Sequence, residues 1–212
     1  MKICAFSDSH GWHNRLAEQN LLPKADTIVF AGDFMTDGYQ HSEVVAFGAW
    51  FSNLPYKHKI LIGGNHDRML ESDKNWCLTN FSKDVIYLQD SGVEIDGVKF
   101  WGSPYQPAFF NWAFNKNRGD SISQHWKKIP EELDVLITHG PPYGILDSVK
   151  GVGKLGCEEL AKVVQKVSPR VHIFGHIHSG YGTLSAYDTE FHNISYCDEK
   201  YKPKNAPHLI EV

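Results

Sequence analysis

The sequence has few cysteines, and no two of them lie at a metal-binding or redox spacing. Its 212 residues include four cysteines, far apart along the chain, and none belongs to a Cys-x-x-Cys pair. This pattern argues against a thiolate zinc site and against a disulfide framework. Reduced thiols in a cytoplasmic protein are the simplest account, so we expect a cytoplasmic location. The four residues are Cys4, Cys77, Cys157 and Cys197.

Long hydrophobic runs are also missing. No uninterrupted apolar segment approaches the roughly 20 residues that a membrane-spanning helix needs. The apolar run at the N-terminus, residues 3–6, is followed at once by Ser7 and Asp8, and it is too short for a secretion signal. We therefore expect a soluble protein without a membrane partner.

The sequence has no excess of positive charge, and it shows no internal repeat, low-complexity tract or linker. Its 21 basic and 25 acidic residues give a formal net charge of −4. A weakly acidic surface gives no electrostatic reason to bind a nucleic-acid backbone. With 42% hydrophobic residues the chain can bury one good core. We expect one domain over residues 1–212, and the oligomeric state stays open, a homodimer included.

What the sequence does contain is an alternation of short apolar runs with helical patterns. An Asp-Gly pair at 96–97 predicts an antiparallel hairpin within residues 93–101, so the sheet content is of mixed direction. These patterns indicate an α/β protein of two mixed β-sheets flanked by helices. Strands are predicted at 3–6, 27–31, 59–62, 85–88, 135–137 and 171–174, with further strands at 184–187 and 208–212; helices are predicted at 14–22, 41–54 and 156–167.

Polar side chains follow the ends of five predicted strands. The carboxyl ends of parallel strands are where open α/β sheets bind ligands. Residues at i and i+2 near a strand end point the same way, so Asp8 and His10 can converge on one point. The residues at the five ends are Asp8 and His10, Asp33, Asn65 and His66, His139, and His176 and His178.

The chemistry of these side chains indicates a metal centre. Imidazole nitrogens with carboxylate and amide oxygens, and no thiolate, suit Mn²⁺, Fe, Zn²⁺ or Ni²⁺. So many ligands are too many for one tetrahedral ion and suit two ions that share a carboxylate. Two metals about 3.5–4 Å apart can hold a hydroxide and clamp the attacking and leaving oxygens of a displacement at phosphorus. This reasoning predicts a phosphate-ester substrate.

For several residues the sequence supports a purely structural role at least as well as a role in substrate binding. The aromatic segment 101–114 is interpreted first as core filling under a long loop, with a substrate lid as the alternative. Arg68 and Arg118 can meet a phosphate or form surface ion pairs. Tyr143 and Tyr181 lie close in sequence to the strand-end residues and are candidates for lining a substrate pocket.

Taken together, five motifs resemble, in order, the five blocks of the calcineurin-like metallophosphoesterase superfamily. The similarity extends to the branch of metallophosphoesterase-domain-containing proteins, through segments such as Ser103-Pro104 and Gly156-Cys157. One departure is Phe34, where the family usually has Asn or Asp after Gly-Asp. The blocks are Asp8-Ser9-His10, Gly32-Asp33, Gly64-Asn65-His66-Asp67, Thr138-His139-Gly140 and Gly175-His176-Ile177-His178.

The resemblance implies a fold, a ligand set and an activity. The fold would be a four-layer αββα sandwich, and the two divalent ions would be Mn²⁺ first, with Fe, Zn²⁺ or Ni²⁺ as alternatives. His66 would be the catalytic residue that stabilises the transition state or protonates the leaving oxygen, and Asp67 would orient its ring. The implied activity is hydrolysis of phosphodiesters, cyclic nucleotides among them, by a metal-bridging hydroxide; a phosphomonoesterase and a catalytically weak scaffold are the alternatives. One ion would be held by Asp8, His10, Asp33 and His178, and the other by Asp33, Asn65, His139 and His176.

Overall fold

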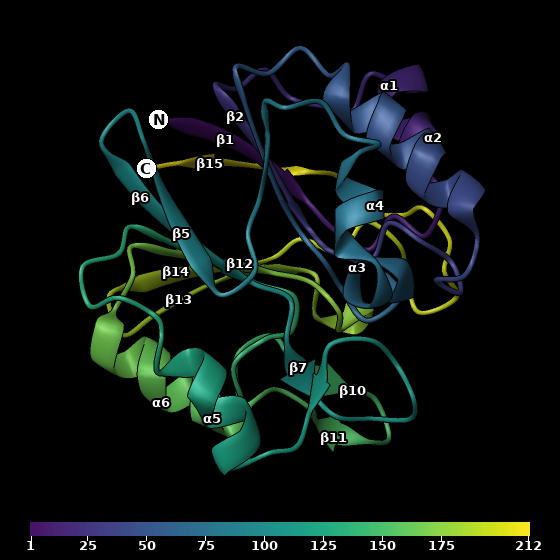
Figure 1. The fold of residues 1–212 in the computed structure, drawn as a ribbon. Helices are drawn as coiled ribbons and strands as arrows, with labels where there is room; N and C mark the ends of the chain where they lie inside the picture. The colour runs from purple at the N-terminus through teal and green to yellow at the C-terminus, as the bar shows by residue number, and fades with distance from the viewer.

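The structure, a computed structural model, describes residues 1–212 and contains two large β-sheets, two short β-ribbons and six α-helices (Figure 1). The first sheet has the spatial order β15 (His208–Glu211), β1 (Lys2–Phe6), β2 (Thr27–Ala31), β3 (His58–Ile62) and β4 (Val85–Tyr87). The second has the order β13 (Gly182–Ala186), β14 (Thr189–Asn193), β12 (Val171–Phe174), β9 (Val135–Thr138), β6 (Val98–Ser103) and β5 (Ser91–Ile95). The ribbons pair β7 (Gln106–Pro107) with β8 (Asn115–Lys116) and β10 (Ser148–Val149) with β11 (Gly153–Lys154). The helices are α1 (His13–Glu18), α2 (His41–Ser52), α3 (Arg68–Ser72), α4 (Lys74–Leu78), α5 (Asp120–Trp126) and α6 (Glu158–Val167).

Both sheets are mixed, as the sequence predicts. In the first sheet β1 to β4 run parallel, and β15 pairs antiparallel with β1 at the edge. In the second sheet β14, β12, β9 and β6 run parallel, and the two edge strands β13 and β5 are antiparallel. The parallel strands of each sheet therefore end together, and this positions the loops that follow them.

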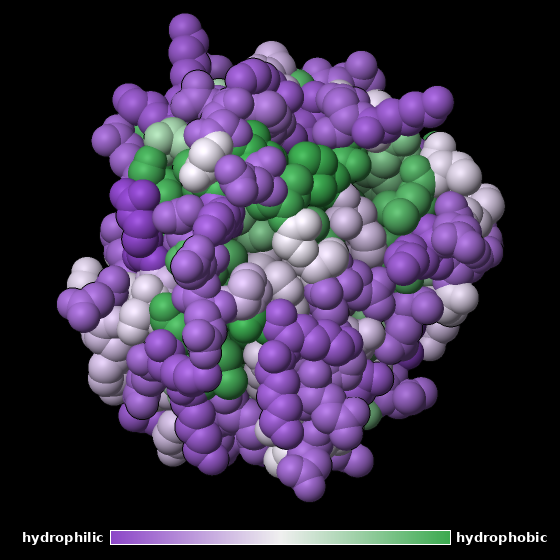
Figure 2. Space-filling view, turned by 60° about the vertical axis from the view of Figure 1, so that its left-hand side comes forward, coloured by the Kyte–Doolittle hydropathy of each residue, from purple (hydrophilic) through white to green (hydrophobic).

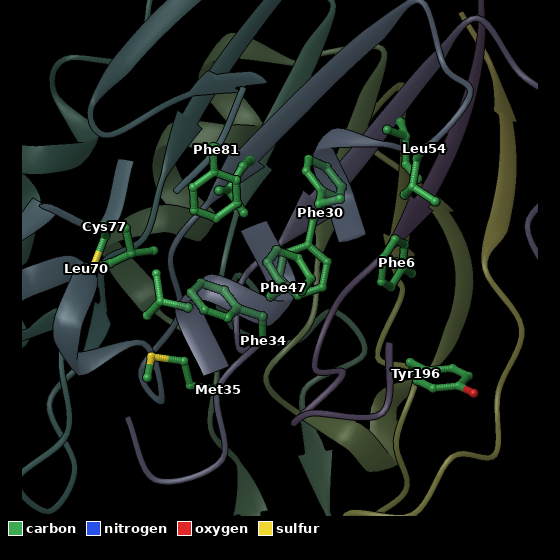
Figure 3. Close-up of a cluster of buried hydrophobic side chains, with 14 of the residues drawn as sticks. Phe6, Phe30, Phe34, Met35, Phe47, Leu54, Leu70, Cys77, Phe81 and Tyr196 are labelled. Carbon is green, nitrogen blue, oxygen red and sulfur yellow. The ribbon is translucent and has the colours of Figure 1, made fainter. Parts of the chain in front are cut away.

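Side chains that alternate along the central strands build three hydrophobic layers. In β1, Ile3 and Ala5 face the second sheet, whereas Cys4 and Phe6 face the helices that cover the first sheet. Residues of α2 such as Phe47 pack against Phe30 in that outer layer (Figure 3). Helices α5 and α6 cover the other face of the second sheet through a third cluster. This arrangement confirms the predicted αββα sandwich.

The local turns explain where the sequence-based elements were right and where they were not. Asp96 and Gly97 both have positive φ and join Ile95 to Val98, which is the predicted two-residue hairpin. A second hairpin joins β13 to β14 at Tyr187 and Asp188, which also have positive φ. Because this turn contains no glycine, the sequence did not indicate it, and β14 was not predicted. Helix α1, predicted over 14–22, ends at Glu18, and α3, α4 and α5 were missed, because helices of five to seven residues give only a weak helical period.

The molecular surface is largely hydrophilic on the face that Figure 2 shows, and hydrophobic residues gather in its upper half. None of the helices is long and apolar enough to pass through a membrane. The first and last strands, β1 and β15, lie side by side, so both ends of the chain are at the same edge of the first sheet (Figure 1).

Candidate metal centre

Loops from both sheets meet at one end of the sandwich. Three of them follow β1, β2 and β3 of the first sheet, and two follow β9 and β12 of the second. The structure brings together every residue predicted at the five strand ends, and most of these side chains are buried. They are Asp8, His10, Asp33, Asn65, His66, His139, His176 and His178.

The backbone at four of these positions has a conformation that L-residues seldom adopt. Asp8, His10, Asp33 and His176 have φ between 40° and 68°. Such strained residues persist only where the surroundings fix them, and they cluster at functional sites. Gly64 is also required, because a Cβ atom there would collide with the carboxylate of Asp33.

The donor atoms form three groups, and Asp33 belongs to two of them. Within each group the atoms lie within 4.8 Å of one another. The groups are Asp8, His10 and His178; His10, Asp33 and His66; and Asp33, His139 and His176. Asp33 Oδ2 lies 3.4 Å from His139 Nε2 and 3.9 Å from His10 Nε2, so its carboxylate lies between the two sets. Donors that bind one ion at about 2.0–2.2 Å lie roughly 3–3.5 Å apart. Asp8 Oδ1 and His178 Nε2, 3.3 Å apart, and Asp33 Oδ2 and His139 Nε2 have this spacing.

Asn65 and the histidine pair add to this donor set. Asn65 Oδ1 lies 2.9 Å from His139 Nε2, within the second group. The Nε2 atoms of His10 and His178 face each other at 3.4 Å. A cation between such nitrogens would use both lone pairs, so the chemistry of the donor set fits divalent metal ions.

Hydrogen bonds fix the ring orientation of three of the histidines. Their Nδ1 atoms donate to backbone carbonyls, at 3.1 Å for His10 to Met35, 2.9 Å for His139 to Ala31 and 2.8 Å for His178 to Asp198. Because a carbonyl only accepts, each Nδ1 carries a proton, so Nε2 is the atom through which each ring would bind a cation. This is the tautomer that a metal-binding histidine needs, and its carbonyl partner is the usual support.

The charges in the site also favour cation binding. Burial would raise the pKa of Asp8, but the hydrogen bond and charge of His178 hold it below its usual value. Burial acts the same way on Asp33, and His139 and His66 hold its pKa well below the usual value. Burial lowers the pKa of His10 to about 4 and that of His176 to about 3, so both rings are neutral at pH 7. Burial would also lower the pKa of His139 and His178, but the carboxylates of Asp33 and Asp8 raise it, to about 9 for His139, so these two rings hold a proton that a bound cation would displace. Ionised carboxylates and neutral imidazoles are the metal-binding forms.

Asp67 has a different contact from the one predicted. Its carboxylate accepts four backbone amide hydrogen bonds, from Asp33 and Gly64 at 2.8 Å and from Phe34 and Met35 at 3.1 Å. The ring of His66 is held instead through Nδ1, which donates to the carbonyl of Thr36. The prediction that Asp67 orients this ring is therefore wrong; Asp67 joins the loop after β2 to the loop after β3.

Phe34, the departure from the family pattern, lies in the hydrophobic core. Its ring is fully buried and stacks on that of Phe47, with ring centroids 4.5 Å apart and an angle of 11° (Figure 3). It points away from the donor atoms and packs under α2. The substitution therefore removes no ligand.

A cavity of about 430 Å³ opens over the donor atoms. One side of it is polar and includes Asp33, Asn65 and His66. The other side is aromatic and is formed by Phe109, Phe110, Trp112 and Tyr201, with Phe110 92% exposed at the rim. A cleft with an apolar wall and a few convergent polar groups is the usual form of a small-ligand site.

The aromatic segment 101–114 divides between the core and the wall of the cavity. Trp101 and Phe114 are buried in the core, as core filling predicts. Phe109, Phe110 and Trp112 line one wall of the cavity, and the role of a substrate lid stays a prediction. The number of aromatic residues does not indicate which of them are buried in the core and which line the cavity.

The structure places three of the other candidate binding residues, Arg68, Tyr143 and Tyr181, outside this cavity. Arg68 lies between the rings of Tyr39 and Trp112, with its Cζ atom 5.0 Å and 4.6 Å from their centroids. Tyr143 is 43% exposed on another surface, where Lys154 lies over its ring.

Tyr181 and Arg118 are engaged by the protein itself. The hydroxyl of Tyr181 donates to the carbonyl of Ala206 at 2.9 Å, and the residue lines a separate polar pocket beside His178. The guanidinium of Arg118 reaches the cavity wall, but it is bound to Glu158 and to the carbonyls of Leu155 and Gly156.

Comparison with known proteins agrees with this geometry. The family model described as calcineurin-like phosphoesterase matches residues 1–180. The chain is 40% identical over 217 residues to human metallophosphoesterase domain-containing protein 1, covering 90% of this chain and 66% of the human protein. It thus spans just under two thirds of the length of that relative. A UPF0046 protein of Caenorhabditis elegans is 34% identical over 225 residues, covering 100% of this chain and 75% of the worm protein.

Solved structures share the fold at low sequence identity. The protein TT1561 of Thermus thermophilus has a TM-score of 0.60 at 14% identity, covering 91% of this chain and 88% of that chain. Another crystal structure has a TM-score of 0.64 at 16% identity, covering 91% of this chain and 89% of the other. The family implies a dinuclear divalent metal centre, which the two donor groups around Asp33 fit. This chain belongs to the calcineurin-like phosphoesterase family.

Proposed function

We propose that this protein is a metal-dependent phosphoesterase that hydrolyses small phosphodiesters, cyclic nucleotides among them. The observation that carries the proposal is the position of Asp33, which belongs to two donor groups at the floor of a cavity that His66 also lines. A carboxylate shared by two cations is the arrangement that displacement at phosphorus uses.

Two divalent cations would complete this site. Asp8, His10, Asp33 and His178 would hold one, and Asp33, Asn65, His139 and His176 the other. When bound, they would supply Lewis-acid stabilisation of the charge on the phosphoryl oxygens and an activated water. The nitrogen and oxygen donors favour Mn²⁺, with Fe, Zn²⁺ and Ni²⁺ as alternatives.

His66 is the residue of this chain best placed to move a proton. Its Nδ1 atom is committed to the carbonyl of Thr36, so Nε2 is the nitrogen that can exchange a proton. The backbone amide of His66 donates to Asp33 Oδ1 at 2.7 Å, which ties the residue to the shared carboxylate. We infer that the protonated ring donates to the leaving oxygen of the ester, as a general acid.

The cavity wall favours a diester over a monoester. The only Lys or Arg side chain that lines it is that of Arg118, whose charge is compensated by Glu158. A monoester carries a second negative charge that finds no free cation in this wall. A diester carries one charge and a second ester group, which the rings of Phe109 and Trp112 can cover.

The reaction is tested with Mn²⁺-loaded protein on bis(p-nitrophenyl) phosphate and p-nitrophenyl phosphate. We expect higher kcat/KM on the bis-ester and a loss of about 100-fold for His66→Ala, because general acid catalysis contributes roughly 10²–10⁴. His41→Ala, at the exposed start of α2, is the matched control and stays at the wild-type rate.

Two outcomes would replace the proposal. A preference for the mono-ester would make the protein a phosphomonoesterase. No turnover of either ester with Mn²⁺, Fe²⁺, Zn²⁺ or Ni²⁺ would favour a scaffold that keeps the fold without catalysis.

We also propose the cellular compartment in which the protein acts and the class of partner that it binds. All four cysteines are buried and unpaired, which supports a reducing compartment such as the cytoplasm. The partner we propose is a small phosphate ester rather than a nucleic acid or a membrane.

A further inference from the structure

A turn near the C-terminus lies directly over the metal centre. The ring of Tyr201, in this turn, has its centroid 4.8 Å from that of His10, 5.5 Å from that of His178 and 5.7 Å from that of His66. It lines the same cavity as His66. Residue 201 lies beyond residues 1–180, which the family model matches, so no block of the family pattern includes it.

The turn is held in one conformation by its own hydrogen bonds. The carboxylate of Asp198 accepts from the amides of Lys200 and Lys202, at 2.9 Å and 3.0 Å. The carbonyl of Asp198 accepts from the amide of Tyr201 at 2.9 Å and also from His178 Nδ1 at 2.8 Å. One oxygen atom therefore fixes both Tyr201 and a predicted metal ligand.

A residue from the N-terminal part of the chain also holds the turn 198–202 in place. The indole nitrogen of Trp12 donates to the carbonyl of Tyr201 at 3.1 Å. Tyr201 itself has a φ of 57°, a conformation that the surrounding contacts must maintain. The hydrogen-bonded turn 198–202 therefore holds the side chain of Tyr201 in the wall of the cavity.

The hydroxyl of Tyr201 is available to a ligand. The residue is 48% exposed, and its hydroxyl makes no hydrogen bond within the protein, whereas the hydroxyl of Tyr181 donates to the carbonyl of Ala206. A tyrosine hydroxyl can donate a hydrogen bond to an anionic oxygen.

We propose that Tyr201 is a substrate-binding residue whose hydroxyl donates a hydrogen bond to a non-bridging phosphate oxygen of the ester. The inference rests on the proposed function and adds to it a residue from outside the family blocks. The ring stands on the side of the site held by His10 and His178, next to the proton donor His66. The phosphate is thereby bound between the site floor and the turn 198–202.

The test uses Tyr201→Phe, which removes only the hydroxyl, with Tyr187→Phe at the exposed β13–β14 turn as the matched control. Binding of inorganic phosphate to the Mn²⁺-loaded protein is measured by calorimetry, together with metal content and turnover of bis(p-nitrophenyl) phosphate. Because a hydrogen bond to a charged group is stronger than one between neutral groups, we expect Tyr201→Phe to weaken phosphate binding and to lower kcat/KM by about 10-fold or more. Metal content should not change.

Several results would overturn the inference. Phosphate affinity and turnover equal to wild type in Tyr201→Phe would do so, and so would a loss confined to Tyr201→Ala, which would make the ring only a wall. A drop in metal content would show a structural role instead. If wild-type protein hydrolysed no ester, the proposed function would fail, and the phosphate affinities would still decide the role of Tyr201.

Discussion

The indole of Trp112 stacks on the imidazole of His66, with ring centroids 4.1 Å apart and an angle of 28° between the planes. Trp112 belongs to the loop between β7 and β8, far from His66 in the sequence. The face of the His66 ring is therefore held by one loop while its Nδ1 atom is held by another. Both contacts limit how far the free nitrogen can move.

Trp112 is expected to act by positioning His66. Small displacements of a reacting group cost large factors in rate, so Trp112→Ala should lower kcat about 10- to 100-fold on bis(p-nitrophenyl) phosphate. Trp112→Phe keeps a stacking ring and should recover most of the rate. Steady-state kinetics separate this from a role in binding alone, because a rise in KM at unchanged kcat would make Trp112 only a part of the cavity wall.

Arg68 is expected to act through Trp112, since its guanidinium lies between that indole and the ring of Tyr39. Arg68→Met should lower kcat less than Trp112→Ala, and the double variant should cost no more than Trp112→Ala alone. Arg68→Lys should not restore the rate, because an ammonium lacks the planar face that stacks on rings. Additive losses in the double variant would show that Arg68 acts independently.

Asp67 is expected to determine the stability of the site loops. Asp67→Asn replaces an acceptor of four amide hydrogen bonds by a group with one acceptor oxygen, and buried amides lose partners. We expect the free energy of unfolding to fall by about 2–4 kcal/mol, with a loss of metal binding. Urea denaturation and metal analysis measure both, and His66→Ala is the comparison that should keep its metals. Wild-type stability in Asp67→Asn would contradict this account.

The stability of the protein is expected to fall in mild acid, in part through His13. This ring is buried against Phe47 and Trp50, neither of its nitrogens has a hydrogen-bond partner, and burial lowers its pKa to about 4. The unfolded chain takes up this proton near pH 6.5, whereas the folded protein takes it up only near pH 4. The stabilisation is therefore complete above pH 6.5 and declines as the pH falls toward 4.

A variant isolates the contribution of His13 from that of the other histidines. At pH 5.5 the cost of keeping His13 neutral is about 1.4 kcal/mol. His13→Phe should remove that part of the decline, so the difference in unfolding free energy between pH 7.5 and 5.5 becomes smaller by this amount. Equal differences in the two proteins, measured by urea denaturation at each pH, would show that His13 does not carry the effect.

The parts of the molecule that could be predicted from sequence are those in which local pattern decides structure. Apolar runs that stop at polar residues indicate the strand ends at Asp8, Asp33 and His139. Parallel strands of one sheet end at the same edge, so these residues are expected to lie close together. The covering helices α2 and α6 were found because their apolar periodicity extends over ten residues or more. Fold class and the convergence of the donor residues on one site followed from these signals, whereas the division of the donors between two ions is what the family resemblance implies.

The parts that could not be predicted depend on contacts between distant segments. Tyr201 reaches the site because its turn bonds to His178 and Trp12, and no motif marks a tyrosine for that position. Asp67 follows His66 directly, yet its carboxylate is taken by amides of the loop after β2. Trp112 and Phe114 are two residues apart and have different roles, because only the first faces the cavity.

The central claim is that Asp33 is shared by two bound cations, and anomalous scattering from crystals soaked in Mn²⁺ tests it most directly. We predict two anomalous peaks, one on the side of His10 and His178 and one on the side of His139 and His176, with the carboxylate of Asp33 between them. A single peak, or peaks away from Asp33, would contradict the account.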